Sequence, residues 1–134
     1  MAHYVVGDVQ GCYQELQSLL KKINFNSNKD KLIFAGDLVN RGSESEKVLN
    51  FCIKNKNSVR AVLGNHDFYL LYLIEHEKKD KSLKKVLESK NLNKYYSWLK
   101  KLFIDWDSLG INPNLRPEEV SLEEYLEISK NYKE

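Results

Sequence analysis

The sequence has 134 residues, of which 42% are hydrophobic and 30% are charged, and its formal net charge is +2. This composition is typical of a globular protein and excludes a wholly disordered chain. The longest apolar runs span about five residues, whereas a membrane-spanning helix needs roughly twenty, so we expect no transmembrane segment. The first residues lack the basic and apolar parts of a secretory leader, which favours a cytoplasmic location.

The charged residues are unevenly distributed along the chain. Residues 1–102 contain 18 Lys and Arg against 11 Asp and Glu, whereas residues 103–134 contain 3 against 8. The net charge therefore changes from +7 to −5 near Phe103. This change indicates two segments of different surface or origin, and a chance distribution of charges is the alternative.

The two cysteines, Cys12 and Cys52, have neither a zinc-binding nor a redox-motif spacing. A reducing cytosol would leave both of them unpaired. We therefore expect both to be small residues of the hydrophobic core.

Three short apolar runs predict strands, and each run ends at a glycine. The runs are His3–Val6, Lys31–Ala35 and Val59–Leu63. After each run, apolar residues recur at helical spacing, in the segments Tyr13–Lys22, Val48–Cys52 and Phe68–Glu77. The order βαβαβα predicts an α/β fold with a parallel sheet and right-handed crossovers.

The remaining residues predict further helices. The Lys-rich stretch 78–101 has apolar residues at helical intervals, so we expect a pair of short helices there. Basic residues beside aromatic ones can contact nucleic acid, but lysines on a solvated helix face are the simpler interpretation. Further along, Ser121 and Glu124 form a capping box that predicts a last helix.

The loops that follow the three predicted strands contain the residues best suited to chemistry. Asp8, Asp37 and Asn65 each come directly after the glycine that ends a strand. A single Gly-Asp pair is usually only a turn, but the carboxyl ends of parallel strands meet at one edge of a sheet. We therefore expect the three side chains to converge and to hold divalent cations, which in pairs activate water and neutralise phosphoryl oxygens.

Two further loop residues suit phosphate chemistry. Arg41 lies four residues beyond Asp37, where its guanidinium can bind two phosphate oxygens, although a surface salt bridge is the alternative. His66 is the one histidine within these loops, and an imidazole can protonate a leaving oxygen. A structural role for His66 is the alternative, and its position beside Asn65 favours catalysis.

These motifs together resemble the calcineurin-type metallophosphoesterase superfamily. They are the run His3–Leu16, the loop Gly36-Asp37-Leu38-Val39-Asn40-Arg41-Gly42, and the run Val59–Asp67. Within the superfamily they look most like the symmetrical diadenosine tetraphosphatases, over residues 2 to about 102. The resemblance implies the parallel βαβαβα half of a metallophosphoesterase sandwich in residues 1–102, followed by short C-terminal helices.

The resemblance also implies a substrate and a cofactor. The substrate is a dinucleoside polyphosphate, with diadenosine tetraphosphate cleaved to two ADP molecules. The cofactor is a pair of divalent metal ions, with Mn²⁺ favoured over Co²⁺ or Mg²⁺. We expect no membrane partner, and we regard nucleic acid as the less favoured ligand.

Individual roles follow from the same resemblance. It assigns the metal ions to Asp8, Gln10, Asp37 and Asn65, the substrate to Arg41 and Asn40, and catalysis to His66 and Arg41. Gln10 stands where most of the superfamily has a histidine, so it either coordinates metal or orients water. Asn40 replaces the aspartate that partners the catalytic histidine of protein phosphatases, which argues against protein dephosphorylation.

The resemblance predicts two histidine ligands from a later part of the chain, but the sequence has no histidine after His76. We therefore expect an incomplete site with reduced or absent activity. The second sheet of the sandwich would also be missing, which predicts an exposed apolar sheet face and a possible homo-oligomer. The alternative is a nonenzymatic module that binds RNA or protein through residues 78–101 and the tail.

The tail, residues 103–134, resembles another family. The run Leu109–Tyr125, preceded by Leu102 and Phe103, is similar to the carboxyl end of bacterial small-subunit rRNA adenine dimethyltransferases. That segment lies away from the methyl-donor pocket of those enzymes, so it implies no methyltransferase activity here. We hypothesise that a deletion joined two genes near Phe103.

Overall fold

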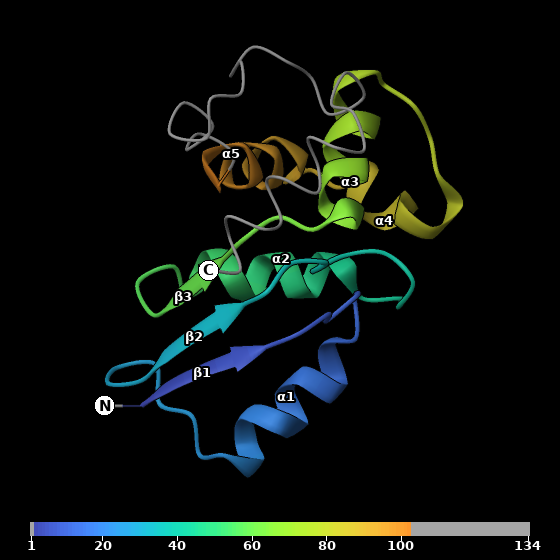
Figure 1. Ribbon diagram of the computed structural model, residues 1–134. Helices are drawn as coiled ribbons and strands as arrows, with labels where there is room; N and C mark the ends of the chain where they lie inside the picture. The colour runs from blue at the N-terminus through green and yellow to red at the C-terminus, as the bar shows by residue number, and fades with distance from the viewer. Residues whose placement is uncertain (1, 103–134) are drawn as a thin grey trace.

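The computed structural model describes residues 2–102, in which strands and helices alternate (Figure 1). The elements are β1 (His3–Val6), α1 (Tyr13–Lys22), β2 (Lys31–Phe34), α2 (Ser45–Lys54), β3 (Val59–Ala61), α3 (Asn65–Glu75), η1 (Lys81–Leu83), α4 (Lys84–Leu87) and α5 (Leu92–Leu102). The predicted tail helix with its capping box lies outside the described residues.

The three strands form one parallel sheet in the order β1-β2-β3. His3 of β1 pairs with Lys31 of β2, and Leu32 of β2 pairs with Val59 of β3. The predicted α/β class and the parallel sheet are therefore confirmed. Because all three strands run the same way, the loops that follow them leave the sheet at one edge.

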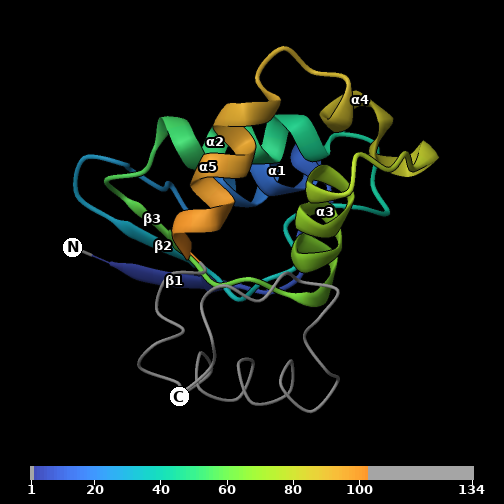
Figure 2. The same ribbon diagram turned by 90° about the horizontal axis from the view of Figure 1, so that it is seen from above.

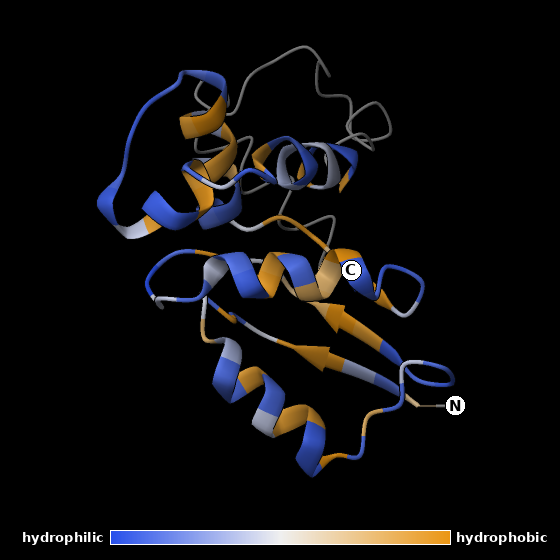
Figure 3. Cartoon of the chain, turned by 180° about the vertical axis from the view of Figure 1, so that it is seen from behind, coloured by the Kyte–Doolittle hydropathy of each residue, from blue (hydrophilic) through white to orange (hydrophobic). Residues whose placement is uncertain are grey.

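Both crossover helices, α1 and α2, lie on the same side of the sheet, and the core forms between them and the strands (Figure 2). Leu32 and Phe34 of β2 point to this side and are fully buried. Their helical partners are Leu16 and Leu20 of α1 and Val48, Leu49 and Cys52 of α2. In Figure 3 these helices mix hydrophobic and hydrophilic residues, as expected for helices with one buried face.

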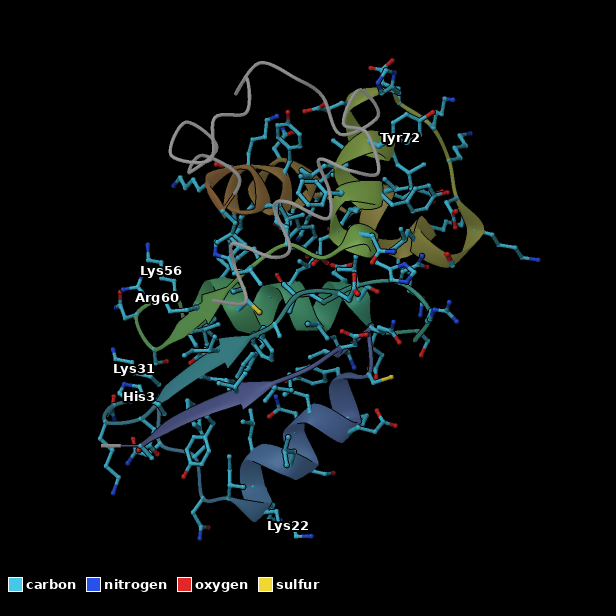
Figure 4. The ribbon with its side chains drawn as sticks, viewed as in Figure 1. His3, Lys22, Lys31, Lys56, Arg60 and Tyr72 are labelled. Carbon is cyan, nitrogen blue, oxygen red and sulfur yellow. The ribbon has the colours of Figure 1, made fainter. Side chains whose placement is uncertain are left out.

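The opposite side of the sheet carries apolar and basic residues together. Val5 is 69% exposed and is in register with Ile33 of β2, which in turn is in register with Arg60 of β3. His3, Lys31 and Arg60 lie near the start of the strands in Figure 4. Among the described residues of this face, Val5 is the exposed large hydrophobic side chain and Ile33 is half-buried, so the apolar face that the sequence predicted stays a prediction.

Two details of the fold differ from the sequence-based expectations. Cys52 is buried, and burial raises the pKa of its thiol, but Cys12 is exposed because it lies in the loop before α1. Its predicted place in the core is wrong. Helix α3 begins at Asn65 rather than Phe68, because the Asp67 side chain accepts a hydrogen bond from the Gly64 amide (2.9 Å) and caps the helix.

The Lys-rich stretch forms η1, α4 and α5, where the sequence predicted two short helices. Tyr95 and Leu99 of α5 are fully buried, and the Tyr95 hydroxyl donates to Glu46 of α2 (3.0 Å). The hydroxyl of the adjacent Tyr96 donates to Glu75 of α3 (2.7 Å). The stretch is thus packed against the rest of the fold.

Within residues 2–102, no helix combines the length and apolar character that crossing a bilayer requires.

The buried Asp30 carboxylate fixes the beginning of the sheet. Its two oxygens accept hydrogen bonds from the amides of Ala2 (3.1 Å) and Asn26 (2.9 Å). The bond from Asn26 is the main reason that the pKa of Asp30 lies below its ordinary value of 3.8, and the bond from Ala2 adds to it. The charged carboxylate therefore connects the amino terminus to the loop before β2.

We predict that Asp30→Asn lowers the melting temperature at pH 7, because the amide leaves one backbone donor without its charged acceptor. A carboxyl whose folded pKa is lowered stabilises the fold above its unfolded pKa and loses this effect as the pH falls through the folded value. The difference from wild type should therefore shrink below pH 3.8. Thermal melts followed by circular dichroism at pH 7 and pH 3 measure it, and an equal difference at both values would contradict the assignment.

Candidate active site

The first two strand-end loops are joined by backbone hydrogen bonds. The amides of Gln10 and Gly11 donate to the carbonyls of Asp37 and Leu38, both at 2.9 Å, and the Gly42 amide donates to the Gln10 carbonyl at 2.7 Å. The loop that contains Asp8 therefore lies directly against the loop that contains Asp37, as the parallel sheet predicts.

A buried carboxylate, Asp67, joins the second loop to the third. One of its oxygens accepts from the Leu38 amide and the other from the Gly64 amide, both at 2.9 Å. The side chain is fully buried, and this desolvation raises the pKa of Asp67 to about 7 against the lowering effect of the two amides. The nearby Asp37 carboxylate raises it further. Sequence reasoning missed this residue.

Asp37 and Asn65 meet at the junction of these loops. One terminal atom of the Asn65 amide lies 3.0 and 3.2 Å from the two carboxylate oxygens of Asp37. If that atom is the amide nitrogen, it donates to both oxygens; if it is the oxygen, two acceptors face each other, as ligands of a shared cation do. The His66 backbone amide also donates to Asp37 (2.9 Å).

Asn40 lies between His66 and the Lys-rich segment. Its side-chain nitrogen is 3.2 Å from Nδ1 of His66, and its side-chain oxygen accepts from the Arg41 amide (2.9 Å). The Ser82 hydroxyl lies 2.7 Å from the same oxygen and 2.5 Å from Asp80, which compete for its one hydrogen. The Arg41 amide fixes the orientation of the Asn40 amide, so its nitrogen faces the imidazole. Ser82 was not predicted from the sequence, because it is distant in the chain and belongs to no motif.

Strained backbone conformations concentrate in these loops. Gln10, Asp37, Asn40 and Arg41 all have positive φ, at 48°, 54°, 76° and 64°. Residues other than glycine rarely adopt this region, and such strain clusters at functional sites. The side chains of the second loop are therefore directed by a backbone that the surrounding hydrogen bonds hold in place.

The predicted ligands supply oxygen donors that suit a hard divalent cation. Asp37 and Asn65 are in contact, while Asp8 is exposed and Gln10 half-buried in the neighbouring loop. Carboxylate and amide oxygens fit Mn²⁺ or Mg²⁺. However, no group of three His, Cys, Asp or Glu side chains able to hold a metal occurs within residues 2–102. The donors thus fit the cation in type, with Asp37 and Asn65 as the assembled pair.

A three-stranded parallel sheet with acidic and amide side chains at one rim is compatible with a phosphoesterase, although other α/β proteins share this arrangement. Residues 1–131 match the family described as calcineurin-like phosphoesterases, and the chain belongs to that family.

Similar curated proteins indicate a narrower group within this family. Over 103 residues, the chain is 47% identical to the symmetrical bis(5'-nucleosyl)-tetraphosphatase of Neisseria gonorrhoeae (strain NCCP11945), covering 75% of this chain and 37% of the relative. It is 45% identical to the enzyme of the same description from Shewanella sp. (strain W3-18-1), covering 75% and 38%. The chain thus spans little more than a third of the length of these relatives.

Solved structures give the same fold. A crystal structure assigned as a diadenosine tetraphosphatase matches with a TM-score of 0.58 and 31% identity, over 72% of this chain and 46% of the other. A protein serine/threonine phosphatase from Saccharomyces cerevisiae matches with a TM-score of 0.54 and 20% identity, over 76% and 36%, and indicates the shared fold alone.

The Asp37 carboxylate leaves no room for a side chain at Gly64. A Cβ there would overlap the Asp37 side chain and lie 2.5 Å from its backbone nitrogen, whereas a Cβ at Gly7 would meet nothing within 4 Å. We predict that Gly64→Ala lowers the free energy of unfolding by about 1–3 kcal/mol through this overlap. Urea denaturation measures the loss.

Gly7→Ala is the matched control, since it adds the same methyl group beside the first loop. It should change the free energy of unfolding by no more than about 0.5 kcal/mol. Equal losses in the two variants would show that the contact between Gly64 and Asp37 is not the cause.

Proposed function

We propose that the chain binds divalent cations at its strand-end loops and acts on dinucleoside polyphosphates, as a phosphohydrolase of the symmetrical tetraphosphatase type. The contact between Asp37 and Asn65 supports this proposal most directly, because two oxygen-bearing side chains from separate loops meet at the rim of the sheet. In this proposal Asp8 and Gln10 contribute from the neighbouring loop. Mn²⁺ is the favoured ion, and Co²⁺ and Mg²⁺ are alternatives.

The cation would supply charge neutralisation for phosphoryl oxygens and an acidified water. Arg41 would bind the phosphate chain, since it is exposed at the rim and directly follows Asn40. A guanidinium fits two phosphate oxygens at once and opposes the negative charge that develops on them.

His66 would act at the leaving oxygen. Because its Nδ1 faces the Asn40 amide, Nε2 is the ring nitrogen left to donate a hydrogen bond or a proton to the phosphate chain. An amide partner, unlike a carboxylate, brings no negative charge toward the imidazole. Because protein phosphatases resemble this chain but have an aspartate at the position of Asn40, the amide argues against a phosphoprotein substrate.

The extent of turnover is a separate part of the proposal. The sequence holds three histidines, and only His66 lies in the strand-end loops. With oxygen donors alone, we expect weak cation binding and a low rate of hydrolysis for this chain.

The division of the chain into two segments is likewise part of our proposal, with a phosphoesterase segment that ends near Phe103 and a tail of different origin after it.

Metal binding is tested by titrating the purified chain with Mn²⁺ in a calorimeter. We expect Asp37→Asn to lower the affinity about tenfold or more, because a carboxylate ligand becomes a neutral amide. Glu88→Gln, which removes an equal charge from an exposed position at the carboxyl end of α4, should bind like wild type. Absence of heat with wild-type protein would favour the nonenzymatic alternative.

Turnover is tested with diadenosine tetraphosphate and Mn²⁺, with ADP release followed by chromatography. We expect slow formation of ADP as the sole product and a loss of about a hundredfold in His66→Ala, within the range for a general acid. Equal rates in wild type and His66→Ala would remove the catalytic role. A specific activity that rises with protein concentration would indicate that a second copy completes the site.

A further inference from the structure

A basic pocket opens beside the candidate active site, between the beginning of α2 and the η1–α4 segment. Its volume is about 450 Å³. Its charged lining consists of four cations and one carboxylate, namely Arg41, Lys81, Lys84, Lys85 and Glu46. The motifs of the strand-end loops do not account for the three lysines, which come from a different part of the chain.

The carboxylates near the pocket are engaged elsewhere. Glu46 accepts hydrogen bonds from the hydroxyls of Ser89 (3.2 Å) and Tyr95 (3.0 Å), which direct it toward the packed interface of α2 with α5. Glu44 pairs with Lys47 at 2.7 Å, and Lys85 adds only a weaker attraction to it. Asp80, which precedes Lys81, accepts from the Tyr69 hydroxyl (2.5 Å) and the Ser82 amide (2.9 Å). The lining itself therefore keeps an excess of positive charge, with four cations against one carboxylate.

A short hydrogen-bonded path connects the pocket to the active site. The Ser82 hydroxyl lines the pocket and lies 2.7 Å from the side-chain oxygen of Asn40 and 2.5 Å from Asp80, so these two acceptors share its one hydrogen. The nitrogen of the Asn40 amide lies 3.2 Å from His66. Arg41 follows Asn40 and also lines the pocket. The pocket thus begins at the end of the second strand-end loop, which contains Asp37 and Asn40.

We propose that this pocket is an oligophosphate subsite, which binds the phosphates of the substrate that extend beyond the bond under attack. The inference rests on the proposed function and adds how the chain would select a polyphosphate over a simple phosphate ester. A chain of linked phosphates carries several negative charges close together, and a pocket with four cations neutralises them where one arginine cannot.

The shape of the pocket favours an oligophosphate over nucleic acid. Proteins that bind single-stranded nucleic acid use an extended basic groove with aromatic side chains on which bases stack. Apart from the hydrophobic Leu83 and Val86, the lining is small or charged and contains no aromatic residue among those described. The cations are instead gathered within one pocket.

The test uses the full chain in EDTA, so that no divalent cation contributes, with inorganic tripolyphosphate titrated in a calorimeter. We expect binding by wild type, and about tenfold weaker binding by Lys84→Glu. Lys22→Glu is the matched control: it changes the net charge equally but lies at the far end of α1, about 15 Å along the helix from its start (Figure 4). This control should bind like wild type.

The possible results separate the alternatives. If Lys84→Glu and Lys22→Glu weaken tripolyphosphate binding equally, the overall charge of the protein explains the binding, and the proposal is overturned. Binding of a single-stranded RNA oligomer without binding of tripolyphosphate would overturn it in favour of nucleic acid. If Lys84→Glu fails to fold, as judged by circular dichroism, Lys85→Ala tests the same pocket and should weaken tripolyphosphate binding about threefold.

The result also separates this proposal from the metal site. Mn²⁺ binding that depends on Asp37, together with no tripolyphosphate binding, would refute the subsite and leave the proposed function intact. Tripolyphosphate binding that depends on Lys84, together with no Mn²⁺ binding, would support the subsite and refute metal-dependent catalysis.

Discussion

The buried carboxylate of Asp67 is the interaction on which the geometry of the site depends. Its oxygens bind the amides of Leu38 and Gly64, which belong to different loops, so the second and third strand ends cannot separate without exposing a charge or leaving two donors unpaired. Full burial makes this carboxylate costly to ionise, as its raised pKa indicates. The two amide donors offset that cost only while both loops stay in place.

Gly36 and Gly64 pack closely where Asp67 joins the second and third loops. Gly36 has φ of 99°, and a Cβ there would lie 2.9 Å from the Gly64 nitrogen. The next residue, Asp37, has a positive φ of 54°, and its carboxylate is in contact with the Asn65 amide. The strain is local, and the hydrogen bonds of Asp67 and of the Gln10 loop hold it in place.

The sequence predicted the strands and helices better than the contacts of Asp67 and Ser82 that join the loops. Hydrophobic runs and glycines located the three strands, because apolar periodicity and turn chemistry are local properties. Asp67 and Ser82 escaped prediction because their roles depend on which amide or side chain lies opposite, and only the folded chain shows that. Cys12 was misplaced for a related reason: a small apolar residue beside a helix gives no signal of which side of the loop faces solvent.

The Lys-rich segment reconciles two interpretations that the sequence left apart. Its apolar face, with Tyr95 and Leu99, is part of the core, and Tyr96 connects it to α3, the helix that begins with Asn65 and His66. Its earlier lysines line the pocket beside Arg41. A segment that supports the site helix from one side and presents positive charge on the other needs no nucleic acid to explain its composition, because packing fixes its apolar residues and a phosphate-rich ligand accounts for its charge.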